Sequence, residues 1–215
     1  MKKYDTIIFD LDGTLLNTLE DLADCVNYAL KQTKMPTRTM EEVRSFVGNG
    51  VGRLMELSIP GGRENPQFEE AFTLFREAYS LHCNDKTGLY PQIKELLSEL
   101  KRREYKMAIV SNKYYNAVLE LQKLYFSEYL DVAIGEKEGI CKKPAPDTVL
   151  EALRKLNSSK ETSVYVGDSE VDIATARNVG MDCIAVTWGF RTKEEQIKAG
   201  GKIFADSPMD ILELI

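Results

Sequence analysis

The stretch TIIFDLDGT, residues 6–14, decides the fold. Its first four residues, Thr6 to Phe9, are apolar or β-branched, which is typical of a strand buried on both faces of a parallel sheet. The run ends in two carboxylates, Asp10 and Asp12, and Gly13 then lets the chain turn. Ligand sites of open α/β sheets lie beyond the carboxyl ends of the strands, so we expect both side chains there. The alternative is a capping turn, because Asp-Gly pairs are common in loops.

Four more runs of this kind follow, and they alternate with helical patterns. Alternation of short buried strands with helices predicts a doubly wound, Rossmann-like α/β parallel sheet. The predicted strands are residues 107–110, 132–134, 163–166 and 183–186. The predicted helices are residues 93–103, 117–125, 148–156 and 171–179, the last of which ends at Gly180, a natural helix stop.

A helical insertion interrupts this alternation between the first and second strands. It contains helical patterns but no convincing strand, at residues 19–32, 40–46, 54–58 and 68–82. We therefore expect two domains, an α/β core of residues 1–17 and 89–215 and a small helical domain of residues 18–88. Asn17 and Thr18 form the predicted hinge, and Thr18 with Asp21 three residues later predicts a capping box on the first inserted helix.

Composition excludes several classes of protein. The chain has 215 residues, and 28 Lys and Arg against 34 Asp and Glu give a formal net charge of −6. Hydrophobic residues at 43% and charged residues at 29% exclude disordered and fibrous proteins. The acidic balance argues against nucleic acid or an anionic membrane as a partner. No apolar run reaches the roughly 18 residues that span a bilayer, and the polar start predicts no signal peptide, so we expect a cytoplasmic protein, a monomer or weak homodimer.

The cysteines and the histidine exclude other chemistry. The four cysteines are widely spaced and form no C-x-x-C pair, so zinc-ligand spacing is absent and reduced thiols are expected. A single histidine, His82, nearly excludes a Ser-His-Asp or Cys-His mechanism. It lies at the far end of the insertion, where we expect a structural role.

A second pair of carboxylates follows another predicted strand. In VGDSEVD, residues 166–172, Asp168 and Asp172 stand four residues apart at the start of a helix. Alone, the pattern also fits an N-cap. Together with Asp10 and Asp12 it indicates a site for a hard metal ion, because Mg²⁺ prefers carboxylate, water and phosphate oxygens.

Two weaker signals complete a phosphate site. Ser111 and Asn112 close the second strand with polar groups, and Lys142 and Lys143 open a loop, KKPAPD, that two prolines stiffen. A Ser-Asn pair is more often a helix cap, and a Lys-Lys pair is more often solvated. Their order along the chain is what gives them weight.

These four motifs, in this order, resemble those of the haloacid dehalogenase-like hydrolases. The motifs are Asp10-x-Asp12-Gly13-Thr14, Ser111, Lys143 and Gly167-Asp168-Ser169-x-x-Asp172. The resemblance covers the whole chain, and an inserted helical cap in this position is similar to that of the phosphoglycolate phosphatase-like and β-phosphoglucomutase-like branch. It implies an enzyme that hydrolyses phosphoric monoesters, with a small phosphorylated metabolite as its partner.

The resemblance also implies a role for each motif residue. Asp10 would be the nucleophile that forms an aspartyl-phosphate, and Asp12 would be the general acid and then the base. Asp10, Asp168 and the main-chain carbonyl of Asp12 would bind Mg²⁺. Asp172 would support that shell or orient Lys143. The expected phosphate- and substrate-binding residues are Ser111, Asn112, Lys143, Gly13, Thr14, Arg53 and Asn49.

Substrate choice would come from the cap. Gly48-Asn49-Gly50 connects two predicted helices, and its backbone can approach a small substrate closely, while Arg53 can pair with a carboxylate. An ordinary loop with a solvated arginine remains the alternative. The segment Thr187 to Phe190 is similar to one that follows the fifth strand in phosphoglycolate phosphatase-like members.

Three functions stay open at this point. The favoured one is a Mg²⁺-dependent phosphatase of 2-phosphoglycolate or a similar small ester. On the same scaffold, the alternatives are an inorganic pyrophosphatase and a β-phosphoglucomutase-like phosphotransferase, although no histidine follows the hinge as it does in the mutases. A non-catalytic binding domain is the alternative from another class, but such a domain would be free to lose Asp10, Asp12 or Lys143, and all three are present.

Overall fold

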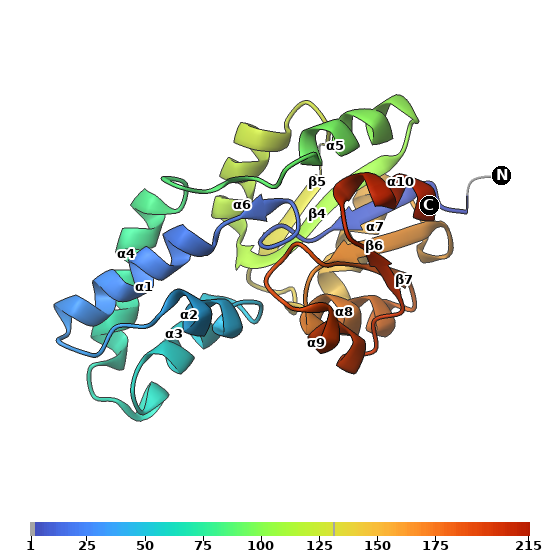
Figure 1. Cartoon of the computed structure of the whole chain (residues 1–215). Helices are drawn as coiled ribbons and strands as arrows, with labels where there is room; N and C mark the ends of the chain where they lie inside the picture. The colour runs from blue at the N-terminus through green and yellow to red at the C-terminus, as the bar shows by residue number, and fades with distance from the viewer. Residues whose placement is uncertain (1–2, 131) are drawn as a thin grey trace. The chain divides into compact units, whose positions relative to one another are not determined.

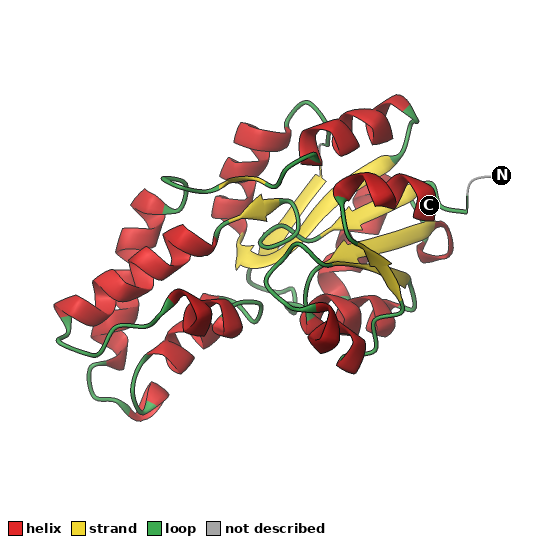
Figure 2. Cartoon of the chain, viewed as in Figure 1, coloured by secondary structure: helices red, strands yellow, loops and turns green. Residues whose placement is uncertain are grey.

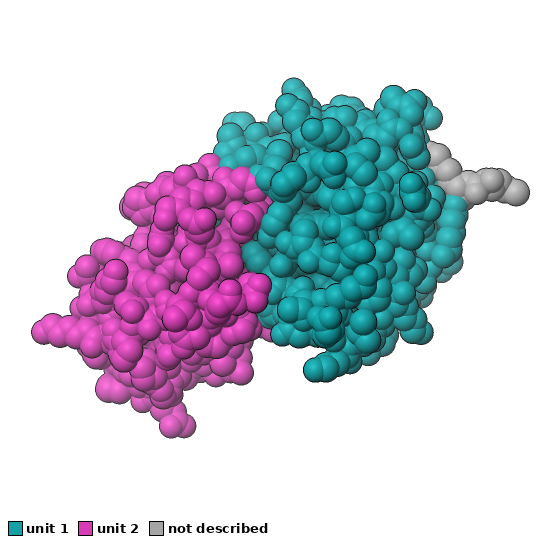
Figure 3. Space-filling model, viewed as in Figure 1, with its two compact units in different colours: residues 1–15, 89–215 teal, residues 16–88 magenta. Residues whose placement is uncertain are grey.

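The computed structural model describes residues 3–130 and 132–215. Met1, Lys2 and Asp131, which the predicted core domain includes, lie outside the described residues. The chain divides into two compact units, residues 1–15 with 89–215 (unit 1) and residues 16–88 (unit 2), which Figure 3 shows in two colours. It passes between them at two short strands, β2 (Leu16–Asn17) and β3 (Gly88–Leu89), which form a two-stranded sheet.

Unit 1 is built on a six-stranded sheet in the order β5-β4-β1-β6-β7-β8, and its neighbouring strands run parallel (Figure 2). The strands are β1 (Thr6–Phe9), β4 (Lys106–Tyr114), β5 (Val132–Glu136), β6 (Ser163–Gly167), β7 (Asp182–Val186) and β8 (Ile203–Ala205). The chain extends the sheet first on one side of β1 and then, from β6, on the other. The strand order therefore reverses between β1 and β6, and ligands of such sheets bind at the carboxyl ends beside that reversal.

Helices flank this sheet (Figure 1). The helical elements of unit 1 are α5 (Ile93–Arg102), α6 (Tyr115–Leu121) with the π-helical turn η2 (Gln122–Phe126), α7 (Asp147–Leu156), η3 (Lys160–Thr162), α8 (Glu170–Val179), α9 (Lys193–Lys198), η4 (Pro208–Asp210) and α10 (Ile211–Leu214). Apolar side chains of α7 and α8, such as Val149 and Ala176, pack with sheet residues such as Ile8 and Val110 in one core. The predicted α/β parallel-sheet fold is confirmed.

Unit 2 is helical and has a core of its own. It consists of α1 (Leu19–Gln32), α2 (Met40–Phe46), α3 (Val51–Ser58), η1 (Gly62–Glu64) and α4 (Phe68–His82). Helices α1 and α4 pack along each other and bury residues such as Val26 and Phe75. Within the described residues, no helix combines the length and the apolar character that crossing a bilayer requires.

The predicted capping box of α1 is wrong. Asp21 does not return to Thr18, because its carboxylate accepts the backbone N–H groups of Lys86 and Thr87 and the Thr87 hydroxyl, at 2.7–3.1 Å. Thr18 makes no side-chain cap bond, and its buried hydroxyl oxygen has no hydrogen-bond partner. Asp21 thus ties the start of α1 to the segment that leaves α4.

Candidate active site

The register of the sheet brings the first and last motifs together. Phe9 of β1 lies opposite Val166 of β6, and the backbone N–H of Asp10 donates to the carbonyl of Val166 at 2.9 Å. Asp10 directly follows β1, and Asp168 directly follows the neighbouring strand β6. The site therefore starts at the reversal of strand order, as expected for an open α/β sheet.

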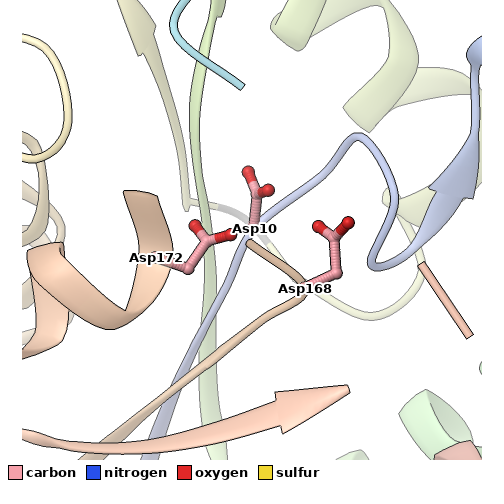
Figure 4. Close-up of side chains that lie close together, drawn as sticks. All are labelled: Asp10, Asp168 and Asp172. Carbon is pink, nitrogen blue, oxygen red and sulfur yellow. The ribbon is translucent and has the colours of Figure 1, made fainter. Parts of the chain in front are cut away.

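Three carboxylates gather at this point. Oxygen atoms of Asp10, Asp168 and Asp172 lie within 4.8 Å of one another, and all three residues are buried (Figure 4). Burial and the charge of Asp172 raise the pKa of Asp10 well above its usual range. The same two causes raise the pKa of Asp168 to about 7. Such a cluster favours a bound cation, and its all-oxygen donor set fits Mg²⁺.

The buried cation of the cluster is Lys143, whose side chain is 3% exposed. Its ammonium donates to Asp10 Oδ1 at 2.7 Å, to Asp172 Oδ1 at 2.8 Å and to the Tyr165 hydroxyl at 3.0 Å. Burial lowers the pKa of Lys143, but the charges of Asp10 and Asp172 outweigh that effect and raise it. Lys143 therefore stays protonated, and it fixes one oxygen of the Asp10 carboxylate.

Asp172 is held from two sides. Ser169 is the N-cap residue of α8, and its hydroxyl and backbone N–H both donate to Asp172 Oδ2, at 2.6 and 3.1 Å, in a capping box. The other oxygen, Oδ1, accepts from Lys143. Burial raises the pKa of Asp172, but the Lys143 charge and the hydrogen bonds from Lys143, Ser169 and Tyr165 together lower it below its usual range. The helix cap and the carboxylate site are thus the same structure, and the two interpretations of this motif do not compete.

The side chain of Asn112 holds the backbone of Lys143. Its side-chain oxygen accepts the backbone N–H of Lys143 at 2.8 Å, and its side-chain nitrogen donates to the Lys143 carbonyl at 3.0 Å. These bonds join the end of β4 to the loop that carries the lysine.

The glycine of the first motif is needed for its backbone conformation and because a side chain would not fit there. Gly13 has a φ of +88°, and a β-carbon there would lie 2.5 Å from Asp168 Oδ2. The following Thr14 donates its hydroxyl to Asp168 Oδ1 at 3.2 Å. The turn after β1 therefore closes against the carboxylate that follows β6.

A loop after β7 completes the enclosure of Asp168. The backbone N–H of Phe190 donates to Asp168 Oδ2 at 2.6 Å, and the Trp188 indole donates to the Thr14 carbonyl at 3.0 Å. Between them, a β-carbon on Gly189 would lie 2.3 Å from Asp168 Cβ and 2.4 Å from the Gly13 carbonyl oxygen. The segment Thr187 to Phe190, singled out in the sequence, thus holds Asp168 in place.

Asp12 stands apart from the three clustered carboxylates. Its Oδ1 accepts from the Lys113 ammonium at 3.0 Å, and its Oδ2 accepts from the Ser111 hydroxyl at 3.4 Å. The motif analysis did not include Lys113. The available signal was alternation, since Lys113 stands two residues after Ser111 on the same strand and so lies on the same side.

The two predicted cap residues belong to unit 2. Gly48 to Gly50 connect α2 to α3, and Asn49 lies in this connection. Arg53, on α3, has a half-exposed side chain that pairs with Glu56 at 2.9 Å. Substrate contact by Arg53 and Asn49 stays a prediction. His82 is exposed at the end of α4 and pairs with Asp85 at 2.7 Å.

A family model described as haloacid dehalogenase-like hydrolase matches residues 7–186, a span that includes all four motifs. The chain belongs to the haloacid dehalogenase-like hydrolases. The resemblance predicted from the motifs is therefore confirmed.

Similar proteins indicate to which branch of the family the chain belongs. The chain is 31% identical to phosphoglycolate phosphatases of Vibrio parahaemolyticus and Aquifex aeolicus, in each case over 97% of this chain and 95% of the other. A crystal structure from Lactobacillus delbrueckii subsp. bulgaricus, assigned provisionally as a phosphoglycolate phosphatase, matches with a TM-score of 0.94 and 37% identity. The match covers 99% of this chain and 98% of that chain. Family and relatives together support a hydrolase of phosphoric monoesters in the phosphoglycolate phosphatase branch, as the sequence predicts.

Proposed function

We propose that this hydrolase cleaves a small phosphomonoester, 2-phosphoglycolate or a similar metabolite, through a phosphoryl group carried on Asp10. The observation that supports this most strongly is the meeting of Asp10, Asp168 and Asp172 with the Lys143 ammonium at the carboxyl ends of β1 and β6. One carboxylate is there to attack, and cationic groups can offset the charge of the phosphoryl oxygens.

The first step forms the covalent intermediate. Lys143 holds Asp10 Oδ1, so the other carboxylate oxygen is the attacking atom. It bonds to phosphorus as the bond from phosphorus to the ester oxygen breaks. Asp12 gives its proton to that oxygen, and the alcohol part of the substrate departs with a neutral hydroxyl group, while the phosphoryl group stays on Asp10.

The second step reverses the role of Asp12. Now a carboxylate, it takes a proton from water, whose oxygen attacks phosphorus and breaks the bond to Asp10. Inorganic phosphate leaves, Asp10 returns as a carboxylate, and Asp12 returns as the acid. Ser111 and Lys143 hold the phosphoryl oxygens in both steps, and general acid–base groups of this kind contribute about 10²–10⁴-fold.

Mg²⁺ is the cofactor of this proposal. The carboxylates of Asp10 and Asp168, with the main-chain carbonyl of Asp12, would hold it, while Asp172 is already occupied by Lys143 and Ser169. When bound, the ion supplies positive charge to the phosphoryl oxygens. Burial and the charge of Asp172 raise the pKa of Asp168 to about 7, and a cation held here would favour its carboxylate form.

The substrate is tested by a screen of the purified protein with Mg²⁺. We expect the highest kcat/KM for 2-phosphoglycolate or another small phosphate ester. Pyrophosphate as the best substrate would favour the pyrophosphatase alternative, and conversion of one sugar phosphate isomer to another would favour the phosphotransferase. No turnover of any of these compounds would contradict the proposal.

The setting of the enzyme is also part of the proposal. The net charge of −6 and four free cysteines support work in a reducing compartment, the cytoplasm, on a small metabolite, without nucleic acid or membrane as partner. We expect a monomer or weak homodimer, and light scattering across a concentration series checks this.

A further inference from the structure

Helix α9 buries a single side chain, and that side chain is polar. Among the residues of α9, all of which the structure describes, only Gln196 is buried, with 0% of it exposed. Its backbone N–H donates to the Thr192 carbonyl at 3.1 Å, and its carbonyl accepts from the N–H of Gly201 at 2.9 Å. Because glutamine is mostly found at protein surfaces, the contacts of this buried amide call for an explanation.

The amide nitrogen of Gln196 joins two segments of the chain. It donates to the carbonyl oxygens of Asp168 and Val186, each at 2.7 Å, and it lies 3.4 Å from the carbonyl oxygen of Arg191. The two hydrogens of the amide match the two short bonds. Asp168 directly follows β6 and Val186 ends β7, so one amide connects the ends of two neighbouring strands.

The oxygen of the same amide shows which half of the group is used. Gln196 Oε1 is buried and has no hydrogen-bond partner. An unpaired polar atom is costly in a core, and a methionine would fill a similar space without that cost. A methionine would, however, remove the donor of both short bonds. The amide is therefore useful here through its nitrogen.

The carboxylate of Asp168 depends on the same two segments. Its Oδ2 accepts the backbone N–H of Phe190 at 2.6 Å, and Phe190 lies in the loop that runs from β7 to α9. Gln196 contacts this loop on both sides of Phe190, at Val186 and at Arg191, and it also holds the Asp168 main chain. It therefore fixes Asp168 relative to the N–H group that the carboxylate accepts.

We propose that Gln196 is a positioning residue, whose amide holds the backbone of Asp168 and so sets how tightly the site binds Mg²⁺. This inference rests on the proposed function, in which Asp168 holds the ion. Gln196 acts through Asp168 and is not a catalytic residue. Side chains that orient the ligands of a metal ion typically change its affinity by about 10–100-fold when they are replaced.

Calorimetric titration of Mg²⁺ into the EDTA-treated protein tests the proposal without measuring activity. Gln196→Met fills the space and removes the donor. We expect the dissociation constant for Mg²⁺ to rise about tenfold or more in this variant. In kinetic measurements, the Mg²⁺ concentration that gives half of the maximal rate should rise by the same factor.

The matched control is Thr33→Val in unit 2. The buried Thr33 hydroxyl also donates to two backbone carbonyls, at 2.8 and 3.2 Å, and valine has nearly the same shape. Both variants should lose stability, because each loses hydrogen bonds to the backbone, but Thr33→Val should bind Mg²⁺ with wild-type affinity. Wild-type affinity in Gln196→Met, or an equal loss in both variants, would overturn the inference, because Gln196 would then only stabilise the fold.

A second measurement uses the wild-type protein and decides the question if Gln196→Met does not fold. Hydrogen exchange of the Gln196 side-chain amide is followed by NMR with Mg²⁺ and with EDTA. Coupling between two sites is reciprocal, so Mg²⁺ should slow this exchange about tenfold or more. The side-chain amide of Asn27, which donates to the Arg38 carbonyl in unit 2, should change little. Equal exchange of Gln196 in both conditions would overturn the inference.

Failure of the proposed function gives a different result. If the wild-type protein itself binds no Mg²⁺, the metal assignment fails and this inference fails with it. If the wild-type protein binds Mg²⁺ and Gln196→Met binds it equally well, only the role of Gln196 is overturned.

Discussion

At the scale of single residues, the site depends on glycines whose backbone packs closely against two of its carboxylates. Gly13, Gly167 and Gly189 each occupy a place where a β-carbon would lie within 2.3–2.5 Å of Asp168 or Asp172. The carboxylates are therefore positioned by backbone approach as much as by their own hydrogen bonds. Positioning of this kind matters because phosphoryl transfer relies on fixed charges more than on flexible groups.

Gly189→Ala tests this positioning. The new methyl group would meet Asp168 Cβ and the Gly13 carbonyl oxygen, so we expect a loss of about 1–3 kcal/mol in the free energy of unfolding. The kcat should fall by about 10²-fold, as expected for a misplacement near 1 Å. The matched control is Gly88→Ala, where a β-carbon meets nothing within 4 Å. Urea unfolding and steady-state kinetics check both, and equal stability of the two variants would contradict the packing argument.

The burial of the cysteines predicts which of them react with an alkylating reagent. Burial and the nearby Asp21 charge raise the pKa of Cys25 to about 12, and burial also raises that of Cys183. Cys141 is exposed. Because the thiolate is the reactive form, iodoacetamide at pH 8 should modify Cys141 first and leave Cys25 and Cys183 unmodified in the folded protein. Mass spectrometry of the peptides checks this, and early modification of Cys25 would count against its burial.

At the scale of elements, the helices of unit 2 were predicted closely where the pattern was long. The predicted and observed bounds agree for α1, α2 and α4, each with a sustained apolar face. For α3 the predicted start lies three residues after the observed one. The first turn of this helix follows Gly50 and has little apolar periodicity. The sequence analysis did not predict strand β8 or helices α9 and α10. These elements are short, and β8 pairs with β7 while α9 packs against α8, contacts that a local pattern does not show.

The residues of the site were also predicted only where the local sequence pattern was clear. The motifs identified the residues that follow β1 and β6, because polar groups after apolar runs are visible in a sequence. Lys113 was missed, because β4 continues past its apolar part through Ser111 and Asn112 to Tyr114. On β5, a β-carbon on Gly135 would lie 2.8 Å from the Lys113 carbonyl oxygen. Neither the length of β4 nor this close approach is visible in the local sequence.

The capping box at the start of α9 should contribute to the stability of the folded protein. Thr192 accepts the N–H of Glu195 at the start of α9, and the Glu195 carboxylate accepts the Thr192 N–H. Thr192→Ala should cost about 0.5–2 kcal/mol in the free energy of unfolding. Thr18→Ala, whose hydroxyl makes no cap bond, serves as the contrast and should cost less. Denaturant unfolding of both variants decides, and an equal or greater cost for Thr18→Ala would contradict the assignment.

At the scale of the whole molecule, net charge and local charge have different meanings. The chain carries −6 overall, and four carboxylates gather near the site. Asp10 and Asp172 pair with the Lys143 ammonium, and Asp12 pairs with Lys113. Acidity at the site therefore does not argue against a phosphorylated substrate. A divalent cation held by this cluster, as we propose, would reverse the local sign.

Cation binding should therefore stabilise the folded protein. At 100 times its dissociation constant, Mg²⁺ should add about 2.7 kcal/mol to the free energy of unfolding, because it binds the folded chain. Asp168→Asn should lose most of this gain, whereas Asp147→Asn, outside the carboxylate cluster, should keep it. Thermal unfolding with and without Mg²⁺, after treatment with EDTA, checks this without measuring activity. An undiminished gain in Asp168→Asn would contradict the metal assignment.

The central claim is that the phosphoryl group passes through Asp10, and a rapid-quench experiment tests it most directly. Protein mixed with a ³²P-labelled ester and Mg²⁺ is quenched in acid, digested and separated, with Asp12→Asn included because it should slow hydrolysis of the intermediate. The account predicts label on the peptide that contains Asp10, more of it in Asp12→Asn with an ester of an acidic alcohol, and none in Asp10→Asn, which should also lose turnover. Label on another residue, or near-wild-type turnover by Asp10→Asn, would contradict it.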